Sequence, residues 1–216
     1  MVEKSIRIMM CIALFALFLN FAANVANAAD IAGVKYKPNI EAVKDKMIEQ
    51  LNELRKLNGL NPLSKDNTAQ KVAQKRANFQ KNNTLTHDGL QDALKEIKNS
   101  NYGTENLATQ WEQNFNSDDE FAKALIVQWF VDEGIENKGH HKQMLNPYYD
   151  ITGVGVKQES NGMVYVSMVY ASTTTMPVTK EIADNINKFY EYFNSNELNK
   201  AVPLPQTDEI INKLKN

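Results

Sequence analysis

The chain has 216 residues, of which 24 are basic, 26 are acidic and only one is a cysteine, so its formal charge at pH 7 is −2. A chain of this length can bury a hydrophobic core as a single domain. The charges are balanced and no basic stripe stands out, which excludes the electrostatic pattern of a nucleic-acid-binding protein.

The first 28 residues have the pattern of a secretory signal peptide. Lys4 and Arg7 precede an apolar run at 8–19, and a small-residue site, Ala-Asn-Ala, follows at 26–28. The apolar run is shorter than the roughly 20 residues that a membrane-spanning helix needs, which disfavours the alternative of a membrane anchor or buried helix. We therefore expect cleavage after Ala28 and a mature chain without a transmembrane segment.

Cleavage would remove Cys11 together with Lys4, Arg7 and Glu3, leaving 188 residues with 22 basic and 25 acidic side chains and a formal charge of −3. A mature chain without a thiol has no disulfide, no thiolate metal ligand and no cysteine nucleophile. Its fold must then depend on the hydrophobic core.

Two helices are predicted after a leader at 29–39. Apolar residues three and four positions apart predict a helix from Ile40 that ends near Gly59; they are Val43, Met47, Leu51 and Leu54. A second helix has a face of small residues that lets another layer approach closely; they are Ala69, Val72, Ala73 and Ala77. His87 follows in a loop.

Helices give way to strands later in the chain. A short helix is expected at 90–97, and Ser117 with Glu120 has the pattern of a capping box that begins a third helix. The segment "KGHHKQML" predicts one or two helical turns. The β-branched segments "ITGVGVKQ" and "MVYVSMVYAS" predict a hairpin, and a last amphipathic helix is expected at 182–190. This order indicates an α+β domain with helices packed on an antiparallel sheet.

Residue chemistry alone does not identify a site. The three histidines, His87, His140 and His141, show no local zinc-binding spacing such as H-E-x-x-H. No G-x-S-x-G motif marks a serine nucleophile. If 139–146 is helical, His140 and His141 point about 100° apart, so we expect only one of them to face a given cleft.

Six segments, taken in order, resemble the CAP superfamily, which comprises cysteine-rich secretory proteins, antigen 5 and pathogenesis-related proteins, and in particular its bacterial SCP-like extracellular members. The resemblance covers about residues 44–171, and its joint order is more specific than any single motif. The segments are "LNELRKLNGLNPLSKD", "TLTHDG", "GTENLA", "VQWFVDE", "GHHKQMLNP" and "ITGVGV". The resemblance implies an α/β/α sandwich of the CAP/SCP type.

The resemblance also implies a cleft lined by two histidines and two glutamates, which match His87, Glu105, Glu133 and His140. In some members of the superfamily the two histidines bind a divalent metal, often zinc, and acidic residues hold water or orient the rings. Neutral imidazoles suit zinc, and a neighbouring carboxylate raises their basicity. The metal ligands expected here are His87 and His140, with zinc or another divalent metal as the cofactor.

The chain departs from the family pattern at two places. Thr104 separates Gly103 from Glu105, an insertion that a loop could absorb or that could turn Glu105 away. Trp129 stands one place before the position where the family carries its tryptophan, which Phe130 occupies. If Trp129 is the true match, Asp132 replaces Glu133; the gap-free alignment favours Glu133. His141 stands where the family has arginine, and we expect it to face solvent or a carboxylate.

The predicted organisation is a signal peptide at 1–28, a leader at 29–39, a CAP/SCP domain at 40–172 and a C-terminal helical extension at 173–216. The segment "LPQTD" at 204–208 resembles a cell-wall sorting signal, but Asp208 replaces the glycine and no apolar stretch or basic cluster follows. We interpret it as a turn before a terminal helix, and expect a monomer that is extracellular or loosely associated with the cell wall.

Three functions remain open from the sequence. The first is a secreted protein whose cleft binds a divalent metal or small ligand at the cell surface or on a host. The second is a zinc-dependent hydrolase, peptidase-like, with Glu105 or Glu133 as general base. The third is a structural cell-wall or adhesion module without cleft activity. The expected partner is a small ligand, a lipid or a surface protein, since the fold alone does not decide.

Overall fold

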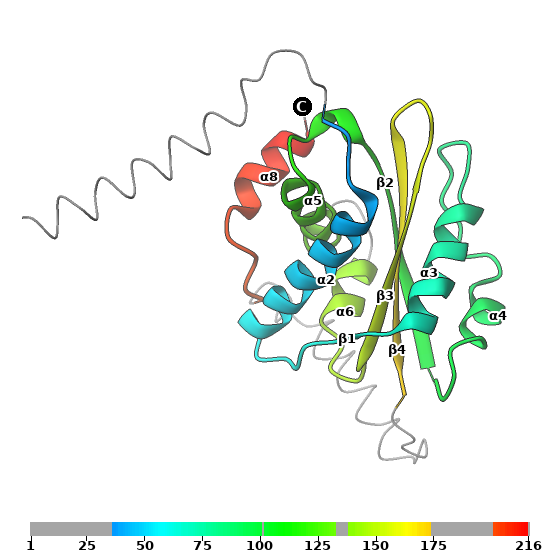
Figure 1. Cartoon of the computed structure of the whole chain (residues 1–216). Coiled ribbons are helices and arrows are strands. Elements are labelled where there is room, and N and C mark those ends of the chain that lie inside the picture. The colour runs from blue at the N-terminus through cyan, green and yellow to red at the C-terminus, as the bar shows by residue number, and fades with distance from the viewer. Residues whose placement is uncertain (1–35, 101, 133–137, 174–200, 216) are drawn as a thin grey trace, which may run out of the picture. The chain divides into compact units, whose positions relative to one another are not determined.

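The computed structural model describes residues 36–100, 102–132, 138–173 and 201–215 (Figure 1). The predicted signal peptide, most of the leader and the helix expected at 182–190 lie outside the described residues. Among the described helices, none combines the length and the apolar character that crossing a membrane requires.

Helices and strands follow the predicted order, with two strands that the periodicity did not predict. The described elements are α2 (Ile40–Leu57), β1 (Ser64–Lys65), α3 (Asn67–Phe79), α4 (Leu90–Leu94), β2 (Tyr102–Trp111), η1 (Glu112–Asn114), α5 (Asp118–Val131), α6 (Gly139–Met144), β3 (Ile151–Gln158), β4 (Met163–Ser172) and α8 (Thr207–Leu214). The additional strands are the two-residue β1 and the longer β2, which contains "GTENLA".

The sheet has the order β1-β3-β4-β2, in which β3 and β4 form the predicted antiparallel hairpin and β2 pairs antiparallel with β4. The short β1 pairs parallel with β3. Helices α2, α5, α6 and α8 lie on one side of the sheet, and α3 and α4 lie on the other (Figure 1). The fold is therefore an α+β, three-layer α/β/α sandwich, as predicted.

Side-chain caps determine where the main helices begin. Asn39 Oδ1 accepts a hydrogen bond from the first turn of α2, and Asp66 caps α3 in the same way. At α5, Ser117 Oγ accepts from the Glu120 amide at 3.1 Å, while the Glu120 carboxylate accepts from the Asn116 amide at 2.8 Å. The capping box is thus present, but its return bond reaches one residue further back than the usual pattern.

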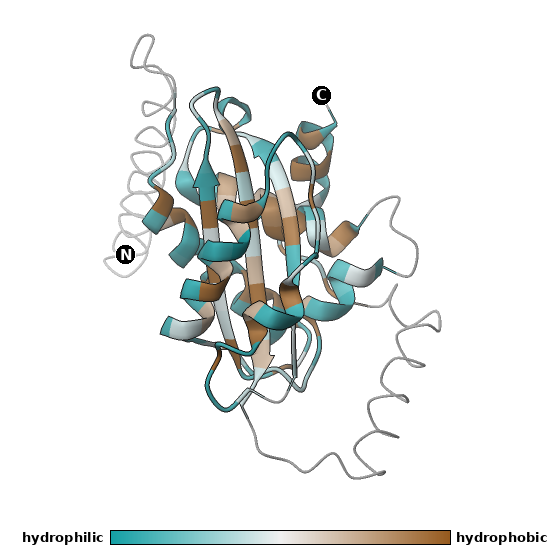
Figure 2. Cartoon of the chain, turned by 90° about the vertical axis from the view of Figure 1, so that its right-hand side faces the viewer, coloured by the Kyte–Doolittle hydropathy of each residue, from teal (hydrophilic) through white to brown (hydrophobic). Residues whose placement is uncertain are grey.

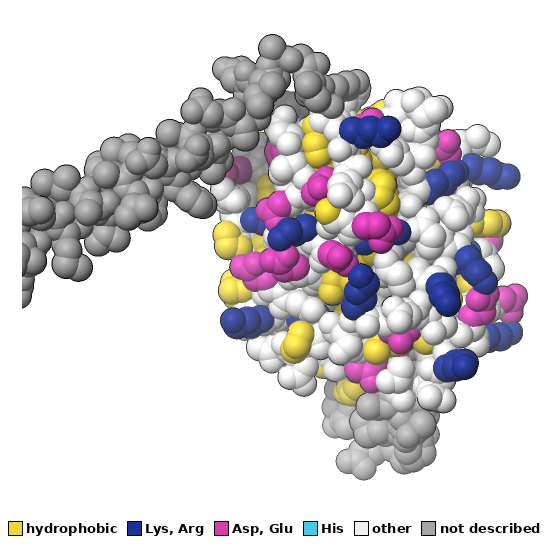
Figure 3. All heavy atoms as spheres, viewed as in Figure 1, with side chains coloured by type: hydrophobic (Ala, Val, Ile, Leu, Met, Phe, Trp, Pro, Cys, Tyr) yellow, Lys and Arg dark blue, Asp and Glu magenta, His cyan; other side chains and the backbone are white. Residues whose placement is uncertain are grey.

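The hydrophobic core lies on both sides of the sheet, and charged side chains are scattered over the surface that Figure 3 shows. Figure 2 shows hydrophobic stretches along the strands behind the more hydrophilic outer sides of α3 and α4. On the face in Figure 3, acidic and basic side chains are interspersed, and exposed pairs such as Lys65 with Asp45 contribute little stability. Burial of apolar surface is therefore the main stabilising term for this cysteine-poor chain.

A fully buried arginine ties α6 to the end of α2. Arg55 donates from Nε to the carbonyl of Asn61 and from Nη1 to the carbonyls of Met144 and Asn146, at 2.8–2.9 Å. Burial lowers the pKa of Arg55 to about 10, so the group stays charged at neutral pH. A cation beside the last carbonyls of a short helix is electrostatically favourable. Arg55 thereby holds the helix that carries His140.

The C-terminal segment packs against α5. Asn58 pairs with the backbone of Val202 in both directions, at 2.8 and 2.9 Å, and Leu204 is buried. The Lys213 ammonium forms an ion pair with Glu120. The "LPQTD" segment therefore forms the turn that leads into α8 and the first two residues of that helix.

Helix α3 lies almost in contact with the backbone of β3, which explains its small-residue face. A Cβ atom added at Gly155 would lie 2.1 Å from the carbonyl oxygen of Ala73, and one at Gly153 would lie 2.2 Å from the amide of Gln70. These are backbone atoms, which cannot move aside as a flexible side chain can. The two layers therefore approach closely only because glycine stands at both positions.

We predict that Gly155→Ala lowers the free energy of unfolding by roughly 1–3 kcal/mol or more, the usual cost of overpacking a core. Urea unfolding followed by circular dichroism measures the change. Gly139→Ala is the matched control, because a Cβ there meets nothing within 4 Å. Equal midpoints for wild type and Gly155→Ala would show that α3 and β3 are less closely packed.

Candidate functional site

Three of the residues predicted for the site meet in one cleft. The loop after α3, strand β2 and helix α6 enclose a space of about 370 Å³, here called the histidine cleft. Its lining residues are His87, Leu90, Thr104, Glu105, Asn106, Gly139, His140 and Gln143. His87, Glu105 and His140 therefore line the same cleft, while Glu133 lies outside the described residues.

The first of two histidine–carboxylate pairs in the cleft, here called the two arms, joins His87 to the buried carboxylate of Glu105. His87 Nδ1 lies 3.0 Å from Glu105 Oε1, and the side chain of Glu105 is fully buried whereas that of His87 is 57% exposed. Since Glu105 is ionised, Nδ1 carries the proton and donates, which leaves Nε2 as an unprotonated nitrogen in the neutral ring. The extra residue Thr104 does not turn Glu105 away from the cleft, because β2 continues through both residues.

Besides His87, two further side chains hold the Glu105 carboxylate. Arg76 contacts both carboxylate oxygens, with Nη2 to Oε1 at 2.7 Å and Nε to Oε2 at 3.0 Å, and Ser167 Oγ donates to Oε2 at 3.0 Å. Burial raises the pKa of Glu105, but the bonds from His87, Arg76 and Ser167 outweigh it and keep that pKa below its usual value. Its charge is thus permanent at neutral pH.

Arg76 is a site residue that sequence reasoning missed, as are Ser167 and Asn106. Arg76 lies on α3, is 4% exposed, and besides Glu105 it donates to the backbone carbonyls of Asp88 at 2.6 Å and Thr86 at 2.8 Å. It therefore positions the carboxylate and both neighbours of His87 together. The sequence did contain a signal that Arg76 is buried. It lies seven residues after Ala69, on the small-residue face of α3, and a charged side chain on a buried face needs a partner.

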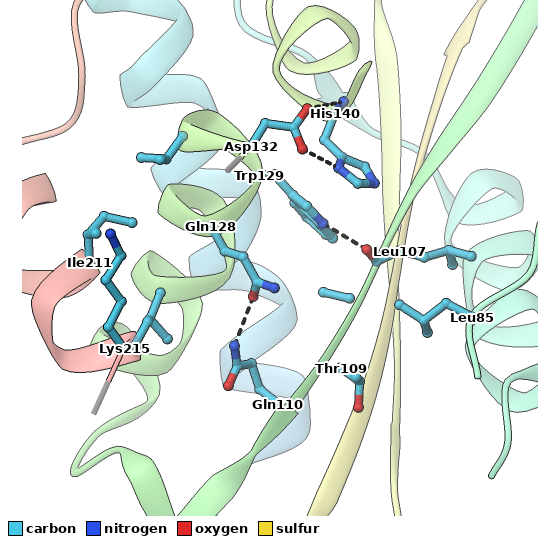
Figure 4. A pocket seen from close by; sticks show the side chains of 13 residues that line it. Leu85, Leu107, Thr109, Gln110, Gln128, Trp129, Asp132, His140, Ile211 and Lys215 are labelled. Atoms are coloured by element: carbon cyan, nitrogen blue, oxygen red, sulfur yellow. Dashed lines mark hydrogen bonds and ion pairs between the residues drawn. The ribbon is translucent and has the colours of Figure 1, made fainter. Parts of the chain in front are cut away.

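The second arm is the hydrogen-bonded pair of His140 and the carboxylate of Asp132. His140 Nδ1 lies 2.7 Å from Asp132 Oδ1, and the His140 amide donates to Oδ2 at 2.9 Å (Figure 4). Asp132 is 4% exposed and ends α5 in a left-handed conformation with φ 50°. Asn106 donates from Nδ2 to the carbonyl of His140 at 3.0 Å and so links α6 to β2.

The carboxylate that the structure places on His140 is Asp132, which corresponds to the alternative alignment through Trp129. Trp129 is 1% exposed and donates from Nε1 to the carbonyl of Leu107 at 2.9 Å. The buried Trp129 side chain therefore links α5 to β2. The preferred match, Glu133, is not among the described residues.

His141 differs from expectation. It was expected to face solvent or a carboxylate, but it is 2% exposed, its ring stacks on Phe130 at 4.4 Å, and Nδ1 lies 2.5 Å from the Phe130 carbonyl. Burial lowers its pKa, so the ring is neutral at pH 7. The expectation was wrong because α6 turns the second histidine of the pair into the core while the first faces the cleft.

The two arms have the same chemical design. In each, a buried carboxylate accepts from Nδ1, which fixes the ring and raises the basicity of Nε2, the arrangement that orients histidine ligands in metal sites. Neutral imidazole nitrogens of this kind are donors that suit a borderline metal such as zinc. In the described part of the chain, no group of three or more His, Cys, Asp or Glu side chains could hold a metal.

Residues 48–170 match the model of the CAP family, described as the cysteine-rich secretory protein family. That match spans more than half of the chain, which therefore belongs to the CAP family. A comparison with curated protein sequences found no significant match.

Three solved structures share the fold. An outer surface protein from Borrelia burgdorferi has a TM-score of 0.52 and 20% identity, over 65% of this chain and 100% of that one. The CAP domain of Enterococcal PrgA has a TM-score of 0.50 and 21% identity, over 69% of this chain and 68% of that one. An extracellular protein with an SCP domain from Bacillus anthracis has a TM-score of 0.50 and 21% identity, over 65% of this chain and 45% of that one.

We predict that Glu105 accounts for part of the protein's acid sensitivity. Because its folded-state pKa lies below the ordinary value of 4.5, the carboxylate contributes stability that is complete above that value and is lost as pH falls through the folded-state pKa. Glu105→Gln should lower the free energy of unfolding by roughly 3–5 kcal/mol at pH 7, since it leaves Arg76 buried without its partner charge.

This difference from wild type should shrink as the pH falls below 4.5, and urea unfolding at a series of pH values measures it. Glu96→Gln is the control, because Glu96 pairs with Lys75 at the surface and should change stability little. A Glu105→Gln penalty that stays constant down to acid pH would contradict the prediction.

Proposed function

We propose that this CAP-family protein is secreted and that its histidine cleft binds a divalent metal, zinc in the first instance, through Nε2 of His87 and Nε2 of His140. The observation that carries the proposal is that two imidazoles in one cleft are each held at Nδ1 by a buried carboxylate. A lone surface histidine needs no such support. Paired support at both rings is typical of metal ligands.

The chain's own residues would bind and orient. Arg76 and Ser167 hold the Glu105 carboxylate, which directs the His87 ring, and Asp132 directs the His140 ring. A bound zinc ion would supply a Lewis acid and lower the pKa of a coordinated water. The resulting site suits a small anionic or carbonyl ligand that replaces water.

Two lines of support favour action outside the cell. The first 28 residues have the pattern of a signal peptide. The structural relatives include an outer surface protein and an extracellular protein. We propose the cell surface or a host as the place of action, with the partner recognised through the cleft.

The hydrolase alternative needs a general base, and Glu105 is poorly suited to that role. Its two oxygens already accept from Arg76, Ser167 and His87, and its pKa is held below the usual value, whereas an efficient base titrates near the working pH. Of the two candidate bases, only Glu133 then stays open. The structural-module alternative assigns the cleft no ligand at all, and a metal titration separates it from the binding proposal.

We predict that zinc binds with a dissociation constant in the micromolar range or tighter and that the His87→Ala/His140→Ala double variant loses this binding. Isothermal titration calorimetry on the purified protein measures both. His141→Phe is the matched control, since it removes a histidine outside the cleft and preserves the stacking on Phe130. Absent binding, or binding that persists in the double variant, would overturn the metal site.

Asp132→Asn should weaken zinc binding about 10- to 100-fold without unfolding the protein, because the amide no longer raises the basicity of His140. Calorimetry measures the affinity, and circular dichroism checks the fold. The control is Asp92→Asn, an exposed carboxylate paired with Lys95 away from the cleft. An affinity equal to that of wild type would show that Asp132 does not support a metal ligand.

A further inference from the structure

A second recess follows the free edge of strand β2. In the described part of the chain, β2 pairs with β4 on one side and no strand pairs with its other edge. Glu112 donates its amide to Gly162, so even-numbered residues of β2 face β4 and odd-numbered residues direct their N–H and C=O groups to the free edge. The bond from Trp129 Nε1 to the Leu107 carbonyl agrees with this orientation.

The recess has a volume of about 400 Å³ and wraps around this edge, and is here called the edge groove. Figure 4 shows Leu85 and Leu107 on one side of β2, with Trp129 and Ile211 on the other. The full lining is Leu85, Leu107, Ala108, Thr109, Gln110, Gln128, Trp129, Val131, Asp132, His140, Ile211, Leu214 and Lys215. Helix α8 therefore forms a wall of the edge groove, and His140 lines both recesses.

The main-chain N–H and C=O groups along the free edge of β2 are spaced to pair with another extended backbone. Thr109, which lines the groove, and Trp111, which lies just beyond its lining, direct main-chain groups to the edge, and the hydroxyl of Thr109 is buried without a hydrogen-bond partner among the described residues. Polar groups shielded from water cost free energy until a partner satisfies them. Exposed strand edges are normally protected by Lys, Pro or a covering element. Neither Lys nor Pro stands at Thr109 or Trp111, whose main-chain groups face the free edge.

We propose that the edge groove binds an extended polypeptide segment of a partner protein, which adds as a strand to β2 at Thr109 and Trp111. Alternate side chains of the segment would lie between Trp129 and the apolar side of α8, formed by Ile211 and Leu214. An acyl chain would fill the apolar volume but leave the edge N–H and C=O groups unpaired, whereas strand addition satisfies them. This inference does not depend on a metal in the histidine cleft.

The test uses a soluble probe, the acetylated and amidated peptide Ser-Thr-Val-Thr-Leu-Thr-Val-Ser, titrated into the purified protein with EDTA present. We expect saturable chemical-shift changes at the Thr109 and Trp111 amides and slower hydrogen exchange there. A peptide of the same sequence with alternate amides N-methylated keeps the side chains but cannot pair, and should bind at least about tenfold more weakly.

Two variants locate the binding. Thr109→Pro removes one outward N–H, a substitution that an edge strand tolerates, and Leu214→Glu places a charge on the α8 wall. Each should weaken peptide binding, and spectra without peptide check the fold. No binding of the peptide, equal binding of the N-methylated form, or binding of laurate that only Leu214→Glu weakens would overturn the proposal. Because EDTA is present throughout, these outcomes are independent of the zinc titration.

Discussion

The buried ion pair between Arg76 and Glu105 is the interaction on which the site depends. It joins α3 to β2 across one layer boundary, and its remaining donors hold the loop that carries His87. An ion pair in the interior is favourable only when hydrogen bonds satisfy the rest of both groups, and here Ser167 and two backbone carbonyls do so. The close approach of α3 to the glycines of β3 is what brings Arg76 within reach.

The second arm, His140 with Asp132, is held in place by other residues. Arg55 holds the C-terminal end of α6, Asn106 holds the carbonyl of His140, and Asp132 receives both the ring and the amide of His140. Each buried carboxylate thus accepts from Nδ1 of one imidazole and orients that ring.

The C-terminal segment changes the character of the neighbouring surface. Without α8, the edge of β2 near Thr109 would be an open strand edge beside α5. With α8 anchored through Val202, Leu204 and Lys213, the same edge lies in a groove with an apolar wall. An element outside the family match, which ends at residue 170, therefore shapes a surface that reaches His140.

Local pattern determined most of the fold. Helical spacing located α2, α3 and α5, the alternation of β-branched residues located β3 and β4, and the ordered family motifs placed His87, Glu105 and His140 in one cleft. Tertiary structure alone decided which described carboxylate holds His140, that His141 is buried, which carboxylate Arg76 pairs with and that "GTENLA" is an edge strand. These depend on contacts between residues distant in sequence, such as Arg76 with Glu105, and periodicity within one element carries no information on them.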